Sequence, residues 1–222
     1  KRQVTAFGSN LAGAIEAATT LPLPAMLAGT SVKVKDSAGV ERLAPLYYVS
    51  PTQVNYVMPA GTTLGAAMVT VTNAAGGTFT ASVEIAALAP GLFAAQGNGQ
   101  GVAAANVLRI KADGSQNYEP VARFDAVQGR WVAVPIDLGP ETDQVYLLLY
   151  GTGIRNRSSV RAVGVGFFPT GAQVTYAGPQ GQYPGLDQVN VLLPRSLRSR
   201  GEVGVALNVD GKAANTLRVN VR

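Results

Sequence analysis

Two residue types that carry much of protein chemistry are missing from this chain, because its 222 residues include no cysteine and no histidine. Without cysteine, disulfides, thiolate zinc sites and cysteine nucleophiles are excluded. Without histidine, the chain lacks the side chain best suited to proton transfer near neutral pH, which is also the commonest metal ligand. We therefore expect a protein that is not an enzyme and that holds no cofactor and no metal.

Charge and long apolar runs are also scarce. Charged residues make up 14% of the chain, against about 25% in average soluble proteins. No run approaches the roughly 18 consecutive apolar residues of a membrane-spanning helix, so we expect no transmembrane segment. The chain begins at Lys1 without the charged and apolar regions of a signal peptide. The balance is typical of a β-rich, secreted or cell-surface protein whose signal peptide is not present in this chain.

What the sequence does contain is a repetition. Three segments of the first half return, in the same order, in the second half. Phe7-Gly8-Ser9-Asn10 returns as Tyr150-Gly151-Thr152-Gly153, Gln53-Val54-Asn55 as Gln188-Val189-Asn190, and the run from Phe79 to Ile85 as the run from Leu217 to Val221. This pattern predicts an internal duplication of one small unit, with insertions in the loops.

Strand-like alternation of apolar and polar residues dominates both halves, as in Leu217-Arg218-Val219-Asn220-Val221. Turn signals separate these runs. They lie at Asp36 to Gly39, Asn73 to Gly77, Asp113 to Ser115, Gln128-Gly129 and Asp210-Gly211. We predict an all-β chain of two tandem immunoglobulin-like sandwiches. The first spans residues 1–90 and the second 91–222, with an extra strand-rich portion at about 102–137.

Several motifs together resemble the Solibacter-type C-terminal domain family, found in tandem on secreted acidobacterial proteins. The resemblance covers nearly the whole chain and rests on Tyr48-Val49-Ser50-Pro51-Thr52-Gln53-Val54-Asn55, Ala89-Pro90-Gly91-Leu92-Phe93, and Asp143 to Gly153. It implies paired immunoglobulin-like or IPT-like units of the kind seen in bacterial surface proteins. It implies no activity and no catalytic residues.

Two segments could carry chemistry and are interpreted otherwise. The acids Asp137, Glu141 and Asp143 could offer oxygen ligands to calcium, but their spacing matches no calcium loop, so a solvated acidic turn is favoured. The glycines of Gly97-Asn98-Gly99-Gln100-Gly101 resemble a nucleotide-binding loop but lack the flanking strand, helix and ribose-binding acid. Sequence-specific nucleic-acid binding has no supporting motif.

Aromatic and basic residues are the candidates for ligand contact. A carbohydrate-binding module is the alternative function, in which exposed aromatic rings would stack on sugars. For Trp131, the sole tryptophan, we favour packing against a sheet face. Two arginine clusters and the net charge of +5 would favour an anionic polysaccharide. The candidates are Tyr47, Tyr48, Trp131, Tyr176, Tyr183, Arg195, Arg198 and Arg200, with Arg155, Arg157 and Arg161 as the other basic cluster.

The function predicted first is a non-catalytic structural or adhesive module, a filament subunit that binds copies of itself or cell-surface proteins. An unpaired sheet edge in the first unit would invite a strand from another chain, and a head-to-tail repeat of that contact would give a fibre. The strand to be exchanged is one of the two terminal segments, residues 1–7 or residues 217–222. Their contact residues are Lys1, Arg2, Gln3, Val4, Thr5, Ala6, Phe7, Leu217, Val219 and Val221.

Overall fold

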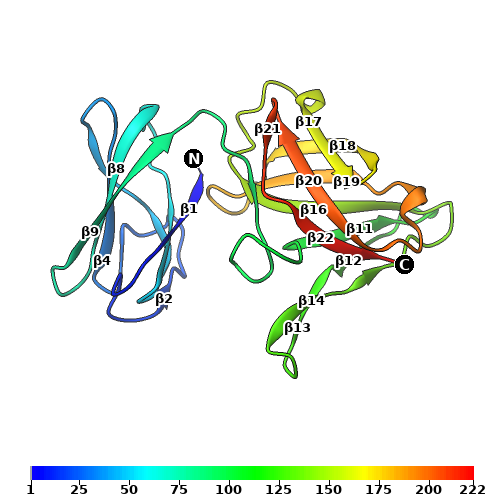
Figure 1. Ribbon diagram of the computed structural model, residues 1–222, viewed down its shortest axis with the longest axis horizontal. Coiled ribbons are helices and arrows are strands. Elements are labelled where there is room, and N and C mark those ends of the chain that lie inside the picture. Colours follow the sequence, from blue (N-terminus) through cyan, green and yellow to red (C-terminus); the bar gives the residue numbers. More distant parts are fainter. Residues whose placement is uncertain (1) are drawn as a thin grey trace. The chain divides into compact units, whose positions relative to one another are not determined.

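The computed structural model describes residues 2–222 and is built from strands, with two short 3-10 turns (Figure 1). It divides into two compact units. The first comprises the described residues up to Ala87 together with Gly181–Gly185, and the second comprises Leu88–Gln180 and Leu186–Arg222. No helix in residues 2–222 is long and apolar enough to cross a bilayer. The prediction of an all-β chain is confirmed.

The first unit is a sandwich of two antiparallel sheets, ordered β1-β7-β6-β2 and β3-β4-β8-β9, with β5 also paired to β4. Apolar side chains from both sheets, such as Val54 and Val69, meet in one buried core. The strands are β1 (Gln3–Phe7), β2 (Glu16–Ala17), β3 (Met26–Leu27), β4 (Thr30–Lys35), β5 (Glu41–Leu43), β6 (Leu46–Val49), β7 (Gln53–Val57), β8 (Gly65–Thr72) and β9 (Thr78–Ile85).

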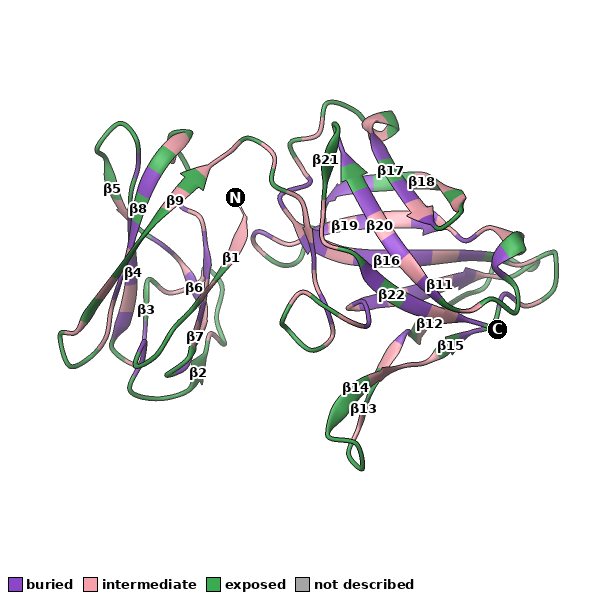
Figure 2. Cartoon of the chain, viewed as in Figure 1, coloured by how far each residue is buried: buried purple, intermediate pink, exposed green. Residues whose placement is uncertain are grey.

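The second unit is larger, and most of its strands follow one hydrogen-bonded path, β12-β11-β16-β19-β18-β17-β20-β22-β15. Its strands and 3-10 turns are β10 (Gly91–Leu92), β11 (Ala105–Ile110), β12 (Gln116–Pro120), β13 (Ala122–Asp125), β14 (Arg130–Ala133), β15 (Pro135–Ile136), β16 (Gln144–Thr152), η1 (Val160–Ala162), β17 (Val163–Phe167), β18 (Thr170–Pro179), β19 (Asp187–Leu192), η2 (Arg195–Leu197), β20 (Gly201–Val209), β21 (Lys212–Ala213) and β22 (Leu217–Val221). Buried residues run along these strands on one side, as Figure 2 shows for β16 and β20.

Two long strands change partner along their length and so join two layers around one core. Strand β18 pairs with β17 through Thr170–Ala172 and with β19 beyond it, and β20 pairs first with β22 and then with β17. The enclosed core takes residues from most strands of both layers, including Leu147, Val189, Val205 and Val219. A side chain therefore reaches this core from alternate positions of each strand.

The five turn signals read from the sequence each close a hairpin, because each lies between two strands that pair antiparallel. The hairpins are β4–β5, β8–β9, β11–β12, β13–β14 and β20–β21. In the first of them the Asp36 carboxylate accepts from the amides of Ala38 and Val40, and Gly39 has a φ of 78°. Such Asx geometry and a positive φ are what Asp and Gly supply in turns.

The sequence echoes have matching strand registers. Phe7 of β1 lies opposite Gln53 of β7, and Tyr150 of β16 lies opposite Gln188 of β19. On the opposite edge of β7, Tyr48 of β6 lies opposite Asn55, and on the opposite edge of β19, Tyr176 of β18 lies opposite Asn190. Each tyrosine adjoins a bulge. In both β7 and β19 the glutamine amide donates to the asparagine oxygen two residues on, at 2.9 and 2.7 Å. The pairings β1-β7-β6 and β4-β8-β9 thus have counterparts in β16-β19-β18 and β17-β20-β22, while the duplication itself stays a prediction.

Candidate binding surfaces

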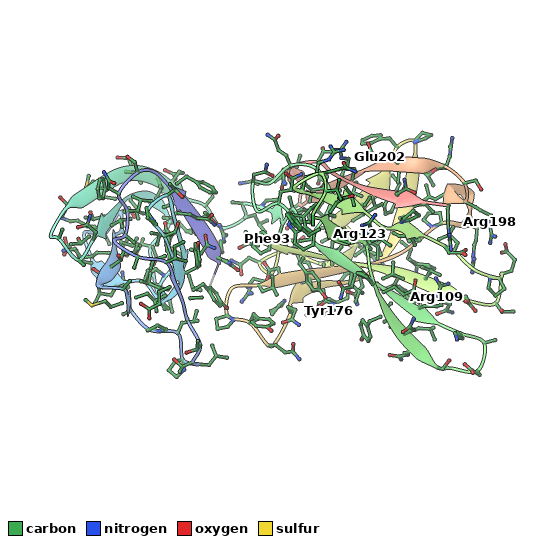
Figure 3. The ribbon with its side chains drawn as sticks, turned by 90° about the horizontal axis from the view of Figure 1, so that it is seen from below. Phe93, Arg109, Arg123, Tyr176, Arg198 and Glu202 are labelled. Carbon is green, nitrogen blue, oxygen red and sulfur yellow. The ribbon has the colours of Figure 1, made fainter. Side chains whose placement is uncertain are left out.

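The acidic turn at residues 137–143 is held by three arginines. The Arg109 guanidinium forms a fork with Glu119 at 2.7 and 3.1 Å, and it also bonds Asp143 and the carbonyl of Asp137. Arg195 donates to the carbonyls of Leu138, Gly139, Pro140 and Asp143, and Arg198 donates to that of Gly139 (Figure 3). These bonds make the turn part of the scaffold.

The electrostatics of this turn agree with that role. The amide of Gly139 donates to the Asp137 carboxylate at 2.8 Å and holds the pKa of that carboxyl below its usual range. The bonds to Glu119 raise the pKa of Arg109 further above neutrality. Within residues 2–222 no three acidic side chains gather in a way that could hold a metal ion.

The cluster of Arg155, Arg157 and Arg161 lies in a loop that one buried acid holds in place. Asp187 is fully buried at the start of β19, and its carboxylate accepts from the amides of Ile154 and Arg155 and from Arg155 Nε at 2.6 Å. Arg155 also donates to the carbonyl of Leu186. Arg157 is half-buried, whereas Arg161 is exposed in the turn η1. Asp187 and Arg155 therefore shape the loop after β16.

The four candidate tyrosines come from three segments of the chain. Tyr47 donates its hydroxyl to the carbonyl of Pro184 at 2.7 Å, and Tyr48 lies next to it on β6. Tyr176 lies on β18 and donates to the carbonyl of Pro179. Tyr183 lies in the loop that follows β18 and is 56% exposed.

The tryptophan lies elsewhere than expected. Strands β13 and β14 form a separate two-stranded hairpin that projects from the second unit (Figure 1). Trp131 on β14 is 37% exposed and meets Phe124 of β13 edge to face, with ring centroids 5.9 Å apart. The prediction that Trp131 packs against a sheet face is wrong, because β13 and β14 pair only with each other in the described chain. We call residues 122–133 the aromatic arm.

Sequence reasoning missed two other exposed residues of this arm. Phe124 is 54% exposed, and Val127 at its tip is 97% exposed. The tip forms a turn in which the Asp125 carboxylate accepts from the amides of Val127 and Gln128. The signal was the Gln128-Gly129 turn itself, since it places residues 124 and 131 opposite each other.

The terminal segments proposed for exchange are strands of their own units. Strand β1 pairs with β7 over all five residues, with Val4 and Ala6 packed against the core and Phe7 66% exposed. Leu217, Val219 and Val221 are at most 2% exposed and belong to the second unit's core. Lys1 lies outside the described residues. Gln3 and Thr5 belong to β1, and Arg2 immediately precedes it.

Another surface was not singled out from the sequence. Strand β9 forms the edge of its sheet, is eight residues long and has no buried residue. Figure 2 shows it in the colours of exposed and intermediate residues only. Its run of Thr, Phe, Val and Ile signals a strand, but only the pairing in space shows that it is an edge.

Two open hollows lie on the surface of the second unit. One of about 410 Å³ lies beside the acidic turn and is bordered by Asp143, Gln173 and Arg195. Another, of about 380 Å³, lies over β20 and β22, where Arg218 pairs with Glu202 at 3.0 Å. Arg200 is exposed in the loop after η2. Neither hollow collects the candidate aromatic residues.

Comparison with known proteins gave similarity at the level of structure alone. No family model matches the sequence, and no curated protein matches it. A structure of domains 5-6 of the S-layer protein SbsC aligns at 13% identity and a TM-score of 0.26, over 99% of this chain and 89% of that one. A tetra-tandem repeat in the extending region of a large adhesion protein aligns at 12% identity and a TM-score of 0.18, over 86% of this chain and 66% of that one. Both TM-scores are too low for anything to be transferred from these proteins.

Proposed function

We propose that this chain is a non-catalytic structural or adhesive module that acts outside the cell or on its surface through contacts with other proteins. The observation that carries the proposal is the open edge of β9, eight residues long and without a buried residue. An exposed edge presents unpaired amide and carbonyl groups and so offers a template for another strand.

Several charged groups support the same proposal, because they hold loops in place. Asp187 and Arg155 form a buried pair, and Arg195 is bonded to four carbonyls. Asp36 is likewise buried and accepts from Thr63, Val40 and Arg42. Side chains with such fixed structural partners are poor candidates for proton transfer, which needs a group within reach of a substrate.

Electron microscopy and sedimentation of the purified protein at several concentrations test this proposal. The expected result is association that grows with concentration. Monomers alone at every concentration, with no binding to cell envelopes, would contradict it. A catalysed reaction that depends on residues of this chain would also overturn the assignment.

The finer form of the proposal is a filament assembled by exchange of β1. In this form residues 1–7 leave β7 of their own chain and pair with β7 of a neighbour. Deletion of residues 1–6 should then abolish filaments. The same deletion also removes Val4 and Ala6 from the core of the first unit, so the folding of the variant needs to be checked by circular dichroism. Unchanged polymers after the deletion would reject strand exchange.

A second function, carbohydrate binding, is favoured by one specific observation, the aromatic arm. Trp131 and Phe124 lie opposite each other on the same face of the hairpin, and both are exposed. Arg123 and Arg130 are exposed on this arm as well (Figure 3 labels Arg123). Aromatic rings supply apolar contact area to a ligand, and arginine donates to carboxylates, so the partner would be an acidic polysaccharide.

A glycan array separates the two functions. If the arm binds sugar, the protein should bind acidic glycans saturably, and Trp131→Ala should lower the signal about tenfold, a loss of the size expected when an aromatic anchor is truncated. Val127→Ser is the matched control, because Val127 lies at the tip and outside the aromatic pair. Binding that survives Trp131→Ala would exclude the arm, and the absence of any binding would leave the structural role alone.

A further inference from the structure

One sheet edge of the first unit and the corresponding sheet edge of the second unit differ in whether other residues cover them. In the second unit, β22 is the counterpart of β9 by its pairing with β20. Its outer side is covered: the amide of Arg218 donates to the carbonyl of Gly101, and the amide of Arg222 donates to that of Ile136. Strand β15 also pairs with β22 in parallel. The extra portion of the second unit therefore closes this edge within the chain.

The first unit has no such cover in its described residues. Strand β9 pairs only with β8 there. The unit's other outer strands are shorter, with two residues in β2 and β3, three in β5 and five in β1. Short edge strands are one way in which proteins avoid unwanted pairing. Strand β9 is eight residues long and contains neither proline nor lysine, and Glu84 is its one charged residue.

The sequence of β9 is complementary to itself. In an antiparallel pair, residues opposite each other must point to the same side of the sheet. When two copies of β9 are aligned about Ser82, Phe79 lies opposite Ile85, Ala81 lies opposite Val83, and Thr80 lies opposite Glu84. On the core side every apolar residue then meets an apolar residue. On the outer side the only charge of the strand meets a hydroxyl group rather than its own copy, so no like charges are opposed.

We propose that the open edge of β9 pairs antiparallel with β9 of a second copy of this chain, with Ser82 at the twofold axis. The inference rests on the proposed function and names its partner and its register. Pairing would extend the sheet β3-β4-β8-β9 through the axis into the sheet of the second copy. It satisfies the outward amides and carbonyls of β9, the groups that an edge leaves to water. The contact is isologous, so by itself it yields a closed dimer.

The absence of cysteine from the sequence makes this register directly testable by cross-linking. Opposite residues in an antiparallel pair have Cα atoms about 4.5–5.5 Å apart, within the range that a disulfide can span. Ser82→Cys should therefore give a disulfide-linked dimer of twice 22.9 kDa under mild oxidation. Thr78→Cys is the matched control and should run as a monomer in non-reducing electrophoresis, because the two residues at position 78 lie at opposite ends of the paired strands. Efficient cross-linking at Ala81→Cys instead of Ser82→Cys would overturn the register.

A charge exchange tests the pairing without a covalent bond. The Ser82 side chain is exposed, so substitution leaves the core intact. Ser82→Lys or Ser82→Glu alone places like charges opposite each other, and each should weaken dimerisation by up to about fivefold in sedimentation. An equimolar mixture should recover dimers of one Lys and one Glu copy. Ala66→Lys is the control, because it adds the same charge to the exposed face of the interior strand β8.

The outcomes distinguish the two proposals. If folded Ser82→Lys and Ser82→Glu each dimerise like the unchanged chain, the β9 pairing is refuted. If electron microscopy still shows larger assemblies in that case, the structural role stands without this contact. If the unchanged chain stays monomeric at every concentration, the β9 pairing fails. If it also does not bind cell envelopes, the structural role fails as well.

Discussion

Replacing Asp187 with Ala should destabilise the second unit strongly and leave the first unit unchanged. The Asp187 carboxylate is fully buried and accepts three hydrogen bonds, two from backbone amides and one from the Arg155 guanidinium at 2.6 Å. Removing one member of a buried ion pair costs about 3–5 kcal/mol, because it leaves a buried charge without its partner. The Arg155 side chain keeps 18% of its surface exposed, so water can compensate part of that loss.

We therefore expect a loss near the lower limit, about 3 kcal/mol in the free energy of unfolding. With a urea dependence of about 2 kcal/mol per molar, the unfolding midpoint would fall by about 1.5 M. Hydrogen exchange with mass spectrometry is the assay, because its peptides report the two units separately. The double variant Asp187→Ala with Arg155→Met should lose less than the sum of the single variants, since it also removes the uncompensated charge.

A loss below about 1 kcal/mol, which is typical of exposed ion pairs, would refute this reasoning. Additive losses in the double variant would do so as well, because they would mean that Asp187 and Arg155 do not act as a pair. Either result would return Arg155 to the group of arginines available to an anionic ligand.

Two further predictions concern the same scaffold. The hydrogen bond from the amide of Thr63 is the largest cause that lowers the pKa of Asp36 from 3.8 to about 2. Because the folded pKa lies below the unfolded one, the ionised carboxylate contributes fully to stability above about pH 4, and this contribution is lost as the pH falls toward 2. In an acid titration, the stability of Asp36→Asn should therefore depend less on pH than that of the unchanged chain. Gly151→Ala should lower the free energy of unfolding by about 1–3 kcal/mol, because the added Cβ would lie 2.3 Å from the carbonyl oxygen of Gly91. Gly164→Ala is the control, since its Cβ would meet nothing within 4 Å, and it should melt within a degree or two of the unchanged chain. Equal melting temperatures for both variants would contradict this.

The sequence predicted the local structure of this chain better than its pairing. Alternation and turn residues such as Asp36 and Gly39 act within a few residues, so they reveal strands and hairpins. The echo of Gln53 and Asn55 in Gln188 and Asn190 likewise marks two strands with the same local arrangement, because in each the glutamine amide donates to the asparagine oxygen two residues on. These features need no knowledge of the rest of the fold.

Edges and arms could not be predicted in the same way. Strands β9 and β22 read alike in the sequence, yet one is open and the other is covered by Gly101 and Ile136. Trp131 was expected to be covered because large apolar rings are usually buried. It is exposed because β13 and β14 continue beyond β12 and β15 as an isolated hairpin. Which strands meet in space is a property of the whole chain.

The arginines show the same limit. A cluster such as Arg195, Arg198 and Arg200 looks like a surface for anions when only the spacing is known. In the structure, Arg195 donates hydrogen bonds to four carbonyls of the acidic turn at residues 137–143, which lies more than 50 residues away in the sequence. A basic cluster in sequence therefore predicts a charge, but its partner has to come from the fold.

The central claim is that the first unit presents an open strand edge whose counterpart in the second unit is closed. Amide hydrogen exchange measured by NMR in dilute, monomeric protein tests it most directly. The account predicts rapid exchange at alternate amides of Thr78–Ile85, slow exchange at the amides of Arg218 and Arg222, and protection of the whole of β9 when the concentration is raised. Slow exchange at every amide of β9 in the monomer would contradict the claim, because it would mean that this edge is already paired.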